Sequence, residues 1–312
     1  MFRPEGSLLY TQENTRILSN RNLIREACFN GTPVEARALR CDAEHNLHVD
    51  LGCMKGVIPR DEGALGIADG SVRDIAVISR VNKPVVFHIT GFCSDENGEN
   101  MAILSRRSVQ QQAMEHFAAA LHPGDVIDAA VSHIESFGVF CDIGAGINAL
   151  MPIDSISVSR IPHPGARFAP GQTIKAVVKN MDETGRITLS HKELLGTWAE
   201  NAAQFAVGET VPGIVRSVEK YGIFVELTPN LAGLAEYTGG ITAGCHAGVF
   251  IKSILPQKMK IKLIIVDAFA ADYPLPPLKY YITGGHIDRW RYSPEGCERV
   301  TESIFDPCPD EE

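Results

Sequence analysis

Apolar and polar residues alternate over short stretches in two copies of one pattern. The segment 123–143, PGDVIDAAVSHIESFGVFCDI, aligns without a gap with the segment 207–227, VGETVPGIVRSVEKYGIFVEL. Each copy has an apolar run led by Gly and an acidic residue, then Phe-Gly-Val-Phe or Tyr-Gly-Ile-Phe, then a turn that contains Gly. Alternation with a period of two predicts β-strands.

The first copy continues into two more β-rich stretches, within TIKAVVKNMDETGRITLS at 173–190. Five short strands within about 70 residues predict the five-stranded oligonucleotide-binding barrel. A more divergent copy lies upstream, where LHVDLGCMKGVIPRDE at 47–62 parallels VFCDIGAGINALMPID at 139–154, and AILSRR at 102–107 parallels ITLSHK at 187–192. The sequence therefore predicts a mainly β protein with three tandem barrels.

Apolar residues at helical spacing lie between the predicted barrels. Residues 106–121 and 191–205 each carry such a stripe, and Ser190 with Glu193 can form a capping box for the second stretch. A further helix is expected at about 12–29. Short α-helices should therefore join the barrels and pack on them. The predicted segments are an N-terminal helical segment at 1–30, barrels at 31–107, 124–194 and 205–284, helical linkers at 108–123 and 195–204, and an acidic segment at 285–312.

The composition is that of a globular protein, with 45% hydrophobic and 21% charged residues. No apolar run approaches the ~20 residues that cross a bilayer, and the start lacks the apolar core of a signal peptide. Eight scattered cysteines without a Cys-x-x-Cys pair indicate reduced thiols and no metal site. We expect a cytoplasmic protein without a membrane partner or a cofactor.

The formal net charge of −9 is unevenly distributed. Residues 285–312 contain three Lys or Arg against eight Asp or Glu, whereas residues 205–267 contain six against five. Because phosphate binding depends on local cationic surface, the acidic total is compatible with RNA binding but predicts weak, salt-sensitive affinity. In the acidic segment we expect Trp290 to seal the last barrel rather than to stack on bases, and the residues after 296 to be helical.

The motifs of residues 124–190 resemble those of the S-one (S1) RNA-binding domain, named after the large multi-domain protein of the bacterial small ribosomal subunit. They are Gly-Asp-x-Val, Val-x-x-Ile-x-x-Phe-Gly-x-Phe-x-Asp, a Pro-Gly-Gln loop and Asp-x-x-x-Arg-Ile-x-Leu-Ser. The resemblance covers 124–194 throughout, 205–284 mainly in its first half, and 31–107 loosely. The whole chain is similar to the shorter S-one homologues of Gram-positive bacteria.

The resemblance implies a five-stranded barrel that binds single-stranded RNA through two aromatic residues, a His, and an Asp and Arg near the last strand. In the middle barrel the matching residues are Phe137, Phe140, Asp182 and Arg186, and Pro152 takes the place of the His.

In the third barrel the aromatic positions are Tyr221 and Phe224, and Glu236 takes the His position. The Asp-x-x-x-Arg turn is replaced there by a longer segment, DAFAADYPLPPLKYYIT, in which Lys279 is a candidate for the Arg position. In the first barrel His45 and His48 occupy the aromatic positions, so RNA binding there is in question.

The chemistry of these residues by itself also suits binding of a single-stranded nucleic acid. Two rings across a Gly can each stack on a base, and an Arg can contact phosphate. The alternative is that the two rings are core residues, because positions i and i+3 point to opposite faces of an ideal strand. Further candidate RNA contacts lie in the loop 157–171 and in the third barrel, and they are Arg160, His163, Arg167, Lys252 and Lys258. An equally weighted alternative is that these residues form a solvated surface without a role in binding.

No nucleotide-binding or hydrolase motif is present, and Cys245-His246 lacks an identifiable acidic partner. The sequence therefore predicts a non-enzymatic, monomeric protein of translation that binds single-stranded RNA or mRNA, with the small ribosomal subunit as a possible partner. The alternatives are a protein-interaction adaptor on the ribosome and an accessory factor of RNA decay or transcription.

Overall fold

The computed structural model of the chain describes residues 2–94, 98–274 and 277–305. The chain divides into two compact units. The first comprises residues 1–121 with 142–148, and the second comprises residues 122–141 with 149–312.

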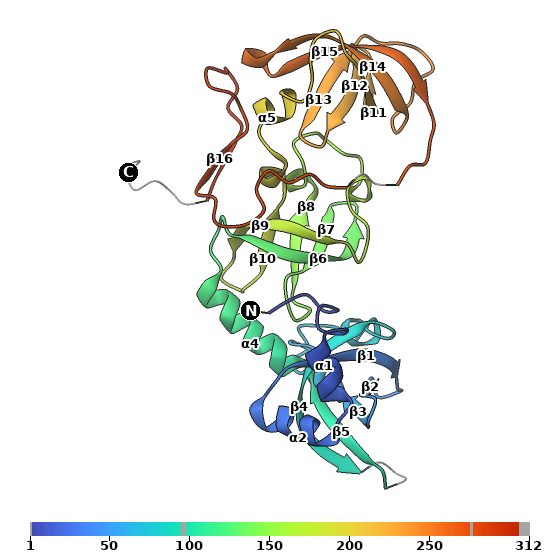
Figure 1. Cartoon of the computed structure of the whole chain (residues 1–312), viewed down its shortest axis with the longest axis vertical. Coiled ribbons are helices and arrows are strands. Elements are labelled where there is room, and N and C mark those ends of the chain that lie inside the picture. The colour runs from blue at the N-terminus through green and yellow to red at the C-terminus, as the bar shows by residue number, and fades with distance from the viewer. Residues whose placement is uncertain (1, 95–97, 275–276, 306–312) are drawn as a thin grey trace. The chain divides into compact units, whose positions relative to one another are not determined.

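Three closed barrels contain most of the β-structure (Figure 1). In each barrel the strands follow one order around the wall, namely first, second, third, fifth and fourth, and the third strand is parallel to the fifth. This is the predicted oligonucleotide-binding fold, so the predicted fold class is confirmed. The first barrel consists of β1 (Val34–Cys41), β2 (Leu47–Asp50), β3 (Lys55–Ile58), β4 (Pro84–Ser94) and β5 (Asn100–Ser105). The middle barrel consists of β6 (Val126–Glu135), β7 (Gly138–Asp142), β8 (Asn148–Pro152), β9 (Thr173–Met181) and β10 (Ile187–Ser190). The third barrel consists of β11 (Thr210–Glu219), β12 (Gly222–Thr228), β13 (Leu231–Ala235), β14 (His246–Leu255) and β15 (Lys260–Phe269).

The alternation read from the sequence is the alternation of burial in the strands. In the third barrel Ile223, Val225, Ile261 and Leu263 point inward and are nearly inaccessible, while the residues between them face outward. Each such buried aliphatic side chain stabilises the fold by roughly 1.5–3 kcal/mol. The inward residues thus hold each barrel together and leave the outward positions available for binding.

Four helices lie before, within and after the first barrel. They are α1 (Gln12–Leu18), α2 (Arg21–Asn30), the short α3 (Ile75–Ile78) and α4 (Arg106–Ala120). On α4 the stripe residues Val109, Ala113 and Phe117 are buried, as their helical spacing predicts.

The single helix predicted at 191–205 is wrong. A 3-10 turn at Lys192–Leu195 is followed by Gly196 at φ 84° and only then by α5 (Trp198–Ala202). A left-handed residue interrupts a helix, and Gly adopts this conformation without steric cost. The capping box of α5 is consequently formed by Thr197 and its N3 residue Glu200.

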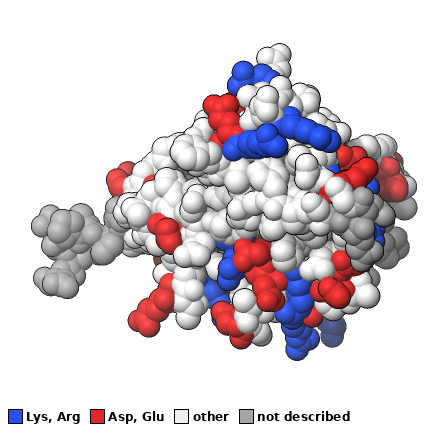
Figure 2. All heavy atoms as spheres, turned by 90° about the horizontal axis from the view of Figure 1, so that it is seen from below, with Lys and Arg blue, Asp and Glu red and all other residues white. Residues whose placement is uncertain are grey.

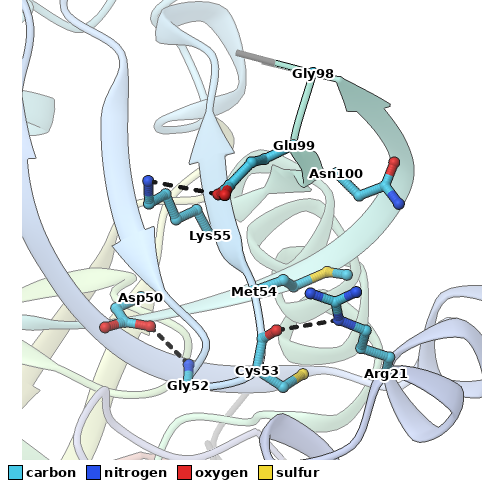
Figure 3. A pocket seen from close by; sticks show the side chains of 9 residues that line it. All are labelled: Arg21, Asp50, Gly52, Cys53, Met54, Lys55, Gly98, Glu99 and Asn100. Carbon is cyan, nitrogen blue, oxygen red and sulfur yellow. Dashed lines mark hydrogen bonds and ion pairs between the residues drawn. The ribbon is translucent and has the colours of Figure 1, made fainter. Parts of the chain in front are cut away.

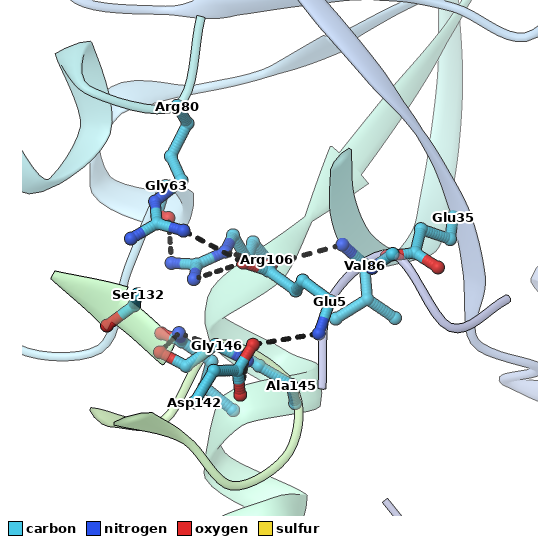
Figure 4. Close-up of polar contacts among 12 residues, drawn as sticks. Glu5, Glu35, Gly63, Arg80, Val86, Arg106, Ser132, Asp142, Ala145 and Gly146 are labelled. Carbon is cyan, nitrogen blue, oxygen red and sulfur yellow. Dashed lines mark hydrogen bonds and ion pairs between the residues drawn. The ribbon is translucent and has the colours of Figure 1, made fainter. Parts of the chain in front are cut away.

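The N-terminal segment is held in the first unit by buried charge (Figure 4). The Glu5 carboxylate accepts hydrogen bonds from Arg106 at 2.6 Å and from Arg80 at 3.2 Å, and the Glu5 amide donates to Asp142 at 2.8 Å. Burial, with the Glu5 charge adding to it, raises the pKa of Asp142 to about 7. Removing one partner of a buried ion pair costs about 3–5 kcal/mol, so this cluster fixes the segment firmly.

After β15 the chain returns to the middle barrel of the second unit. The Lys175 amide donates to the Tyr280 hydroxyl at 3.2 Å, and the Val126 amide donates to the Gly285 carbonyl at 3.0 Å. The chain then forms a two-stranded sheet of β16 (Arg289–Arg291) and β17 (Glu302–Ile304).

Trp290 is buried, as expected, in a core cluster that includes third-barrel residues such as Val249. The prediction of a helix after residue 296 is wrong for residues 297–305, where the structure has β17 and no helix. Residues 306–312 lie outside the described residues.

Candidate nucleic-acid interface

The third barrel carries a row of three outward side chains from three adjacent strands. Phe224 of β12 pairs with Leu234 of β13, and Leu234 pairs with Lys262 of β15. All three point outward, because the residues on either side of each of them in its strand are buried. The row joins a flat ring, an aliphatic side chain and a cation.

Tyr221 places a second ring beside Phe224. Tyr221 lies in the turn before β12 and is 71% exposed, and the two ring centroids are 6.1 Å apart with planes at 86°. A Cβ on the intervening Gly222 would lie 2.5 Å from the carbonyl oxygen of Ala235, so glycine is needed for β13 to approach. The Tyr-Gly-x-Phe motif thus holds two rings edge to face on the surface.

The middle barrel repeats this arrangement without the cation. The centroids of Phe137 and Phe140 are 6.1 Å apart with planes at 89°. Phe137 precedes β7 in the turn and is 54% exposed, and Phe140 is partly exposed, so neither ring belongs to the buried core. Thr188 pairs with Leu150, in the place that Lys262 has beside Leu234.

The corresponding row of the first barrel is His48, Val57 and Ile103. It has no cation at the third position and an imidazole at the first. It therefore lacks the cation of the third-barrel row and has a smaller ring in place of Phe224.

Both histidines of the first barrel are engaged by carboxylates. His48 Nε2 lies 2.9 Å from Asp42, and His45 Nδ1 lies 3.2 Å from Asp74. Partial desolvation of Asp42 raises its pKa, but hydrogen bonds from His48 and from backbone amides outweigh this and lower the pKa to about 2. Arg60 pairs with Asp74 at 2.7 Å and Arg40 lies 3.4 Å from His48 Nδ1, so carboxylates and cations are balanced beside this row.

Asp182 shapes the turn between β9 and β10. Its carboxylate accepts from the Thr184 hydroxyl at 2.7 Å and from the amides of Thr184 and Arg186 at 2.9 Å. The hydroxyl hydrogen bond is the main reason that the pKa of Asp182 is lowered. Arg186 is exposed at the end of this turn. By fixing the turn, Asp182 holds Arg186 on the surface.

The loop 157–171 separates into exposed and buried members. Arg160 and His163 are exposed, and His163 caps the 3-10 turn Pro164–Ala166 by accepting from the Gly165 amide at 3.0 Å. Arg167, by contrast, is only 6% exposed.

Arg167 forms a buried ion pair with Glu226 of β12, which also accepts from Arg216 at 2.8 Å. Glu226 is itself buried and needs these cations, because an unpaired buried charge is costly. Arg167 therefore links the middle and third barrels within the second unit, which corrects the expectation that it contacts RNA.

The candidate lysines of the third barrel lie in different places. Lys252 points outward from β14, and Lys258 lies in the Pro256–Lys258 turn that joins β14 to β15. Lys279 does not replace Arg186: it follows the end of β15, donates to Gln204 at 3.2 Å and stands 5.1 Å from the ring centroid of Tyr281. The place of Lys262 in the row was missed, although alternation in KMKIK at 258–262 indicates that its lysines share a face.

A polar hollow of about 530 Å³ lies in the first unit (Figure 3). Its charged groups have partners within the chain: Lys55 lies 3.9 Å from Glu99, Arg21 donates to the Cys53 carbonyl at 3.2 Å, and Asp50 accepts from the Gly52 amide at 2.7 Å. No aromatic ring is among its described lining residues, so it offers no surface for stacking.

The described chain shows neither a metal site nor a membrane-spanning helix. Basic and acidic side chains are interspersed on the face drawn in Figure 2. Within residues 2–94, 98–274 and 277–305, no group of His, Cys, Asp and Glu is placed to hold a metal ion. None of the helices in this part of the chain has the length and apolarity needed to cross a bilayer. Cys245 shares a hydrogen bond of 3.3 Å with Thr242, which lowers the pKa of the thiol.

Residues 121–192 match the family of the S1 RNA binding domain. The middle barrel is therefore similar to the S1 RNA binding domain. The matched region contains the whole middle-barrel row, Phe140, Leu150 and Thr188, together with Phe137. The resemblance found from the motifs is thereby confirmed.

The chain is also similar to small ribosomal subunit protein bS1. It is 33% identical over 269 residues to bS1 of Staphylococcus aureus (strain COL), covering 84% of this chain and 65% of that protein. It is 29% identical over 228 residues to bS1 of Rhodopseudomonas palustris, covering 70% and 38%. The chain thus spans less than two thirds of the length of these relatives. A solved multidomain protein with nucleic acid binding domains from Streptococcus pneumoniae is 12% identical, with 75% and 73% coverage and a TM-score of 0.24.

Proposed function

We propose that the second unit binds single-stranded RNA, with mRNA as the natural ligand. The observation that carries the proposal is the Phe224–Leu234–Lys262 row with Tyr221 beside it. Stacking on an exposed ring contributes about 1–3 kcal/mol per base whatever the base, and Lys262 adds a cation for phosphate. The middle barrel supplies a second pair of rings on the same unit.

The two rows act together because they belong to one unit. A strand held by one row reaches the other at a high effective concentration, so two weak sites give a useful affinity. The buried Arg167–Glu226 pair supports this arrangement by linking the two barrels.

The similarity to bS1 supports a proposal for the cellular role. We propose a cytoplasmic role in translation, as a monomer that associates with the small ribosomal subunit and catalyses no reaction. In the described part of the chain, the Cys245-His246 pair has a threonine and aromatic rings as its neighbours and no carboxylate, which favours binding over catalysis.

The first barrel is a candidate for protein contact. Its row is His48, Val57 and Ile103, and Asp42 and Asp74 hold its two histidines. An apolar strip flanked by paired charges, with no cation in the row itself, suits a protein partner on the ribosome better than a phosphate backbone.

Fluorescence anisotropy of a labelled single-stranded RNA of about 20 nucleotides tests the proposal. We expect saturable binding that an unlabelled duplex competes for weakly, with log affinity falling linearly with log salt at a slope of about −0.7 per neutralised phosphate. Absence of binding at low salt would leave the barrels as a scaffold for protein partners and would refute the proposal.

A further inference from the structure

The third barrel carries a second aromatic cluster, formed by His246, Phe269 and Tyr273. His246 of β14 pairs with Phe269 of β15, and their rings are within 23° of parallel with centroids 6.2 Å apart. Tyr273 meets His246 edge to face at 4.8 Å. Phe269 and Tyr273 are 45% and 60% exposed, so the cluster lies on the surface. It stands at the end of the β14–β15 pair opposite to their connecting turn.

Strand β15 connects this cluster to the Phe224–Leu234–Lys262 row. After Lys262 the exposed residues of β15 are Ile264, Val266 and Asp267, the last of which pairs with Gly248 of β14, and then Phe269. At about 3.3 Å per residue, Lys262 and Phe269 are ~23 Å apart along the strand. A barrel of this fold contacts about 4–16 nucleotides, so one strand of RNA can extend from the row to the cluster.

The surface beside this path is open in the third barrel and covered in the middle barrel. Gly248, outward on β14, pairs with Pro212, and a Cβ at Gly248 would meet no atom within 4 Å. The corresponding residues of the middle barrel, Asp128 and Lys175, form an ion pair of 2.7 Å. Tyr280 lies against them, since its hydroxyl accepts from the Lys175 amide.

We propose that the His246–Phe269–Tyr273 cluster is a second base-stacking site of the third barrel. It would take single-stranded RNA that continues along β15 from the Phe224–Leu234–Lys262 row, so the inference rests on the proposed function.

The charge on this face changes along β14 and β15. The exposed lysines Lys252, Lys260 and Lys262 lie toward the row, whereas the exposed carboxylates Asp267 and Asp272 lie close to Phe269 in the chain. The cations therefore hold the RNA backbone at the row end, and the cluster itself binds through its rings. Exposed rings next to cations form the combination that binds single strands without regard to sequence. A purely apolar docking face for protein would not require three lysines at one end.

Two RNA lengths separate this site from the row. Anisotropy is measured with labelled RNAs of about 20 and about 6 nucleotides on the full chain, for the wild type and for the double variants Phe269→Ala/Tyr273→Ala and Tyr221→Ala/Phe224→Ala. The double variant Tyr10→Ala/Phe29→Ala, which removes two exposed rings of the first unit, is the matched control. We expect Phe269→Ala/Tyr273→Ala to weaken binding of the longer RNA about tenfold and to leave the shorter one unchanged. Tyr221→Ala/Phe224→Ala should weaken both, and the control neither.

Three results would overturn the inference in distinguishable ways. In the first, circular dichroism shows that Phe269→Ala/Tyr273→Ala is folded, and this variant binds the longer RNA with wild-type affinity while Tyr221→Ala/Phe224→Ala has lost affinity. The second site is then absent and the proposed function stands. If the wild type binds neither RNA, the proposed function fails and the inference with it. If sedimentation shows self-association of the wild type that Phe269→Ala/Tyr273→Ala abolishes without an effect on RNA, the face binds protein. The single variant Tyr273→Ala repeats the test with the smallest disturbance of the strand.

Discussion

The first and third barrels follow one strand order and differ in the side chains that they place at the same three outward positions. The first barrel presents His48, Val57 and Ile103, and the third presents Phe224, Leu234 and Lys262. The inward residues of both are apolar, so the fold is preserved while the surface changes. The comparison shows that the barrel provides a frame and that the outward row decides what it binds.

The middle barrel is intermediate between these two. It has both rings of the third barrel, but Thr188 stands where the third barrel has Lys262. We therefore rank the affinities for RNA as third, then middle, then first. The binding predictions below test this ranking, and the pH prediction tests the stability of the unit that holds the two stronger barrels.

The largest effect should come from removing the rings. Tyr221→Ala/Phe224→Ala should weaken binding of single-stranded RNA by about 2 kcal/mol, or roughly thirtyfold, because two stacking surfaces are lost. Phe137→Ala/Phe140→Ala should cost somewhat less, at least about 1 kcal/mol, and anisotropy measures both. His45→Ala/His48→Ala is the control for the first barrel and should change affinity less than twofold. An equal loss in that control would abolish the distinction between the barrels.

Low pH should reduce the folding stability of the second unit, to which we assign RNA binding. His191 is fully buried, with Nδ1 3.1 Å from the Ile156 carbonyl and Nε2 3.2 Å from the Tyr280 hydroxyl, and burial lowers its pKa to about 4 from 6.5. The unfolded chain therefore binds the proton more readily, so this contribution to stability is complete above pH 6.5 and is lost as pH falls toward 4. Between pH 7.5 and 5.5 the loss should be about 1 kcal/mol.

Urea unfolding of the wild type and of His191→Gln at the two pH values measures this loss. The glutamine cannot take up a proton, so the variant should lack this part of the pH dependence. Identical pH dependence in the two proteins would show that His191 is not the group responsible.

Removing the cation should have a smaller effect that depends on salt. Lys262→Gln should weaken RNA binding by about threefold at low salt and reduce the magnitude of the salt slope by about 0.7, because one phosphate contact is lost. Lys55→Gln in the first barrel is the matched control and should leave the slope unchanged. The reverse change, Thr188→Lys, should steepen the slope by a similar amount if the middle row equals the third in geometry.

The smallest effect is expected from rebuilding the first row. His48→Phe/Ile103→Lys introduces the ring and the cation of the third barrel but leaves Asp42 and Asp74 nearby. We expect a gain in RNA affinity of about twofold, measured by anisotropy in the Tyr221→Ala/Phe224→Ala background, where the third barrel no longer dominates. A loss of affinity instead would show that the row is not what separates the barrels.

The barrels could be predicted from the sequence because their signal is local and repeated. Several short stretches have a period of two, and the copies are related by a constant shift. Together these signals predict five strands for each barrel, and the Phe-Gly-x-Phe motif predicts the aromatic positions. Whether those rings face outward depends on the turn: Phe137 precedes β7, so the opposite-face rule for strand positions i and i+3 does not apply to it.

The remaining contacts depend on pairing across long sequence separations. Lys262 joins the row only because β15 runs parallel to β13, and Arg167 is buried only because Glu226 of another barrel lies against it. In the middle barrel the Asp182–Arg186 turn joins the last two strands, and in the third barrel the corresponding turn lies at 256–259. Lys279 comes after the last strand, so the alignment by motif placed it wrongly. A helix spanning 196 was predicted from apolar spacing and from a Ser190–Glu193 capping box, and neither signal registers the positive φ of Gly196.

Photo-crosslinking of single-stranded RNA to the full chain, followed by peptide mapping, tests the central claim most directly, because it reports which barrel touches the bases. The account predicts crosslinks in the peptides that contain Tyr221 and Phe224 first, in those that contain Phe137 and Phe140 second, and none around His45 and His48. Crosslinks confined to residues 31–107 would contradict it.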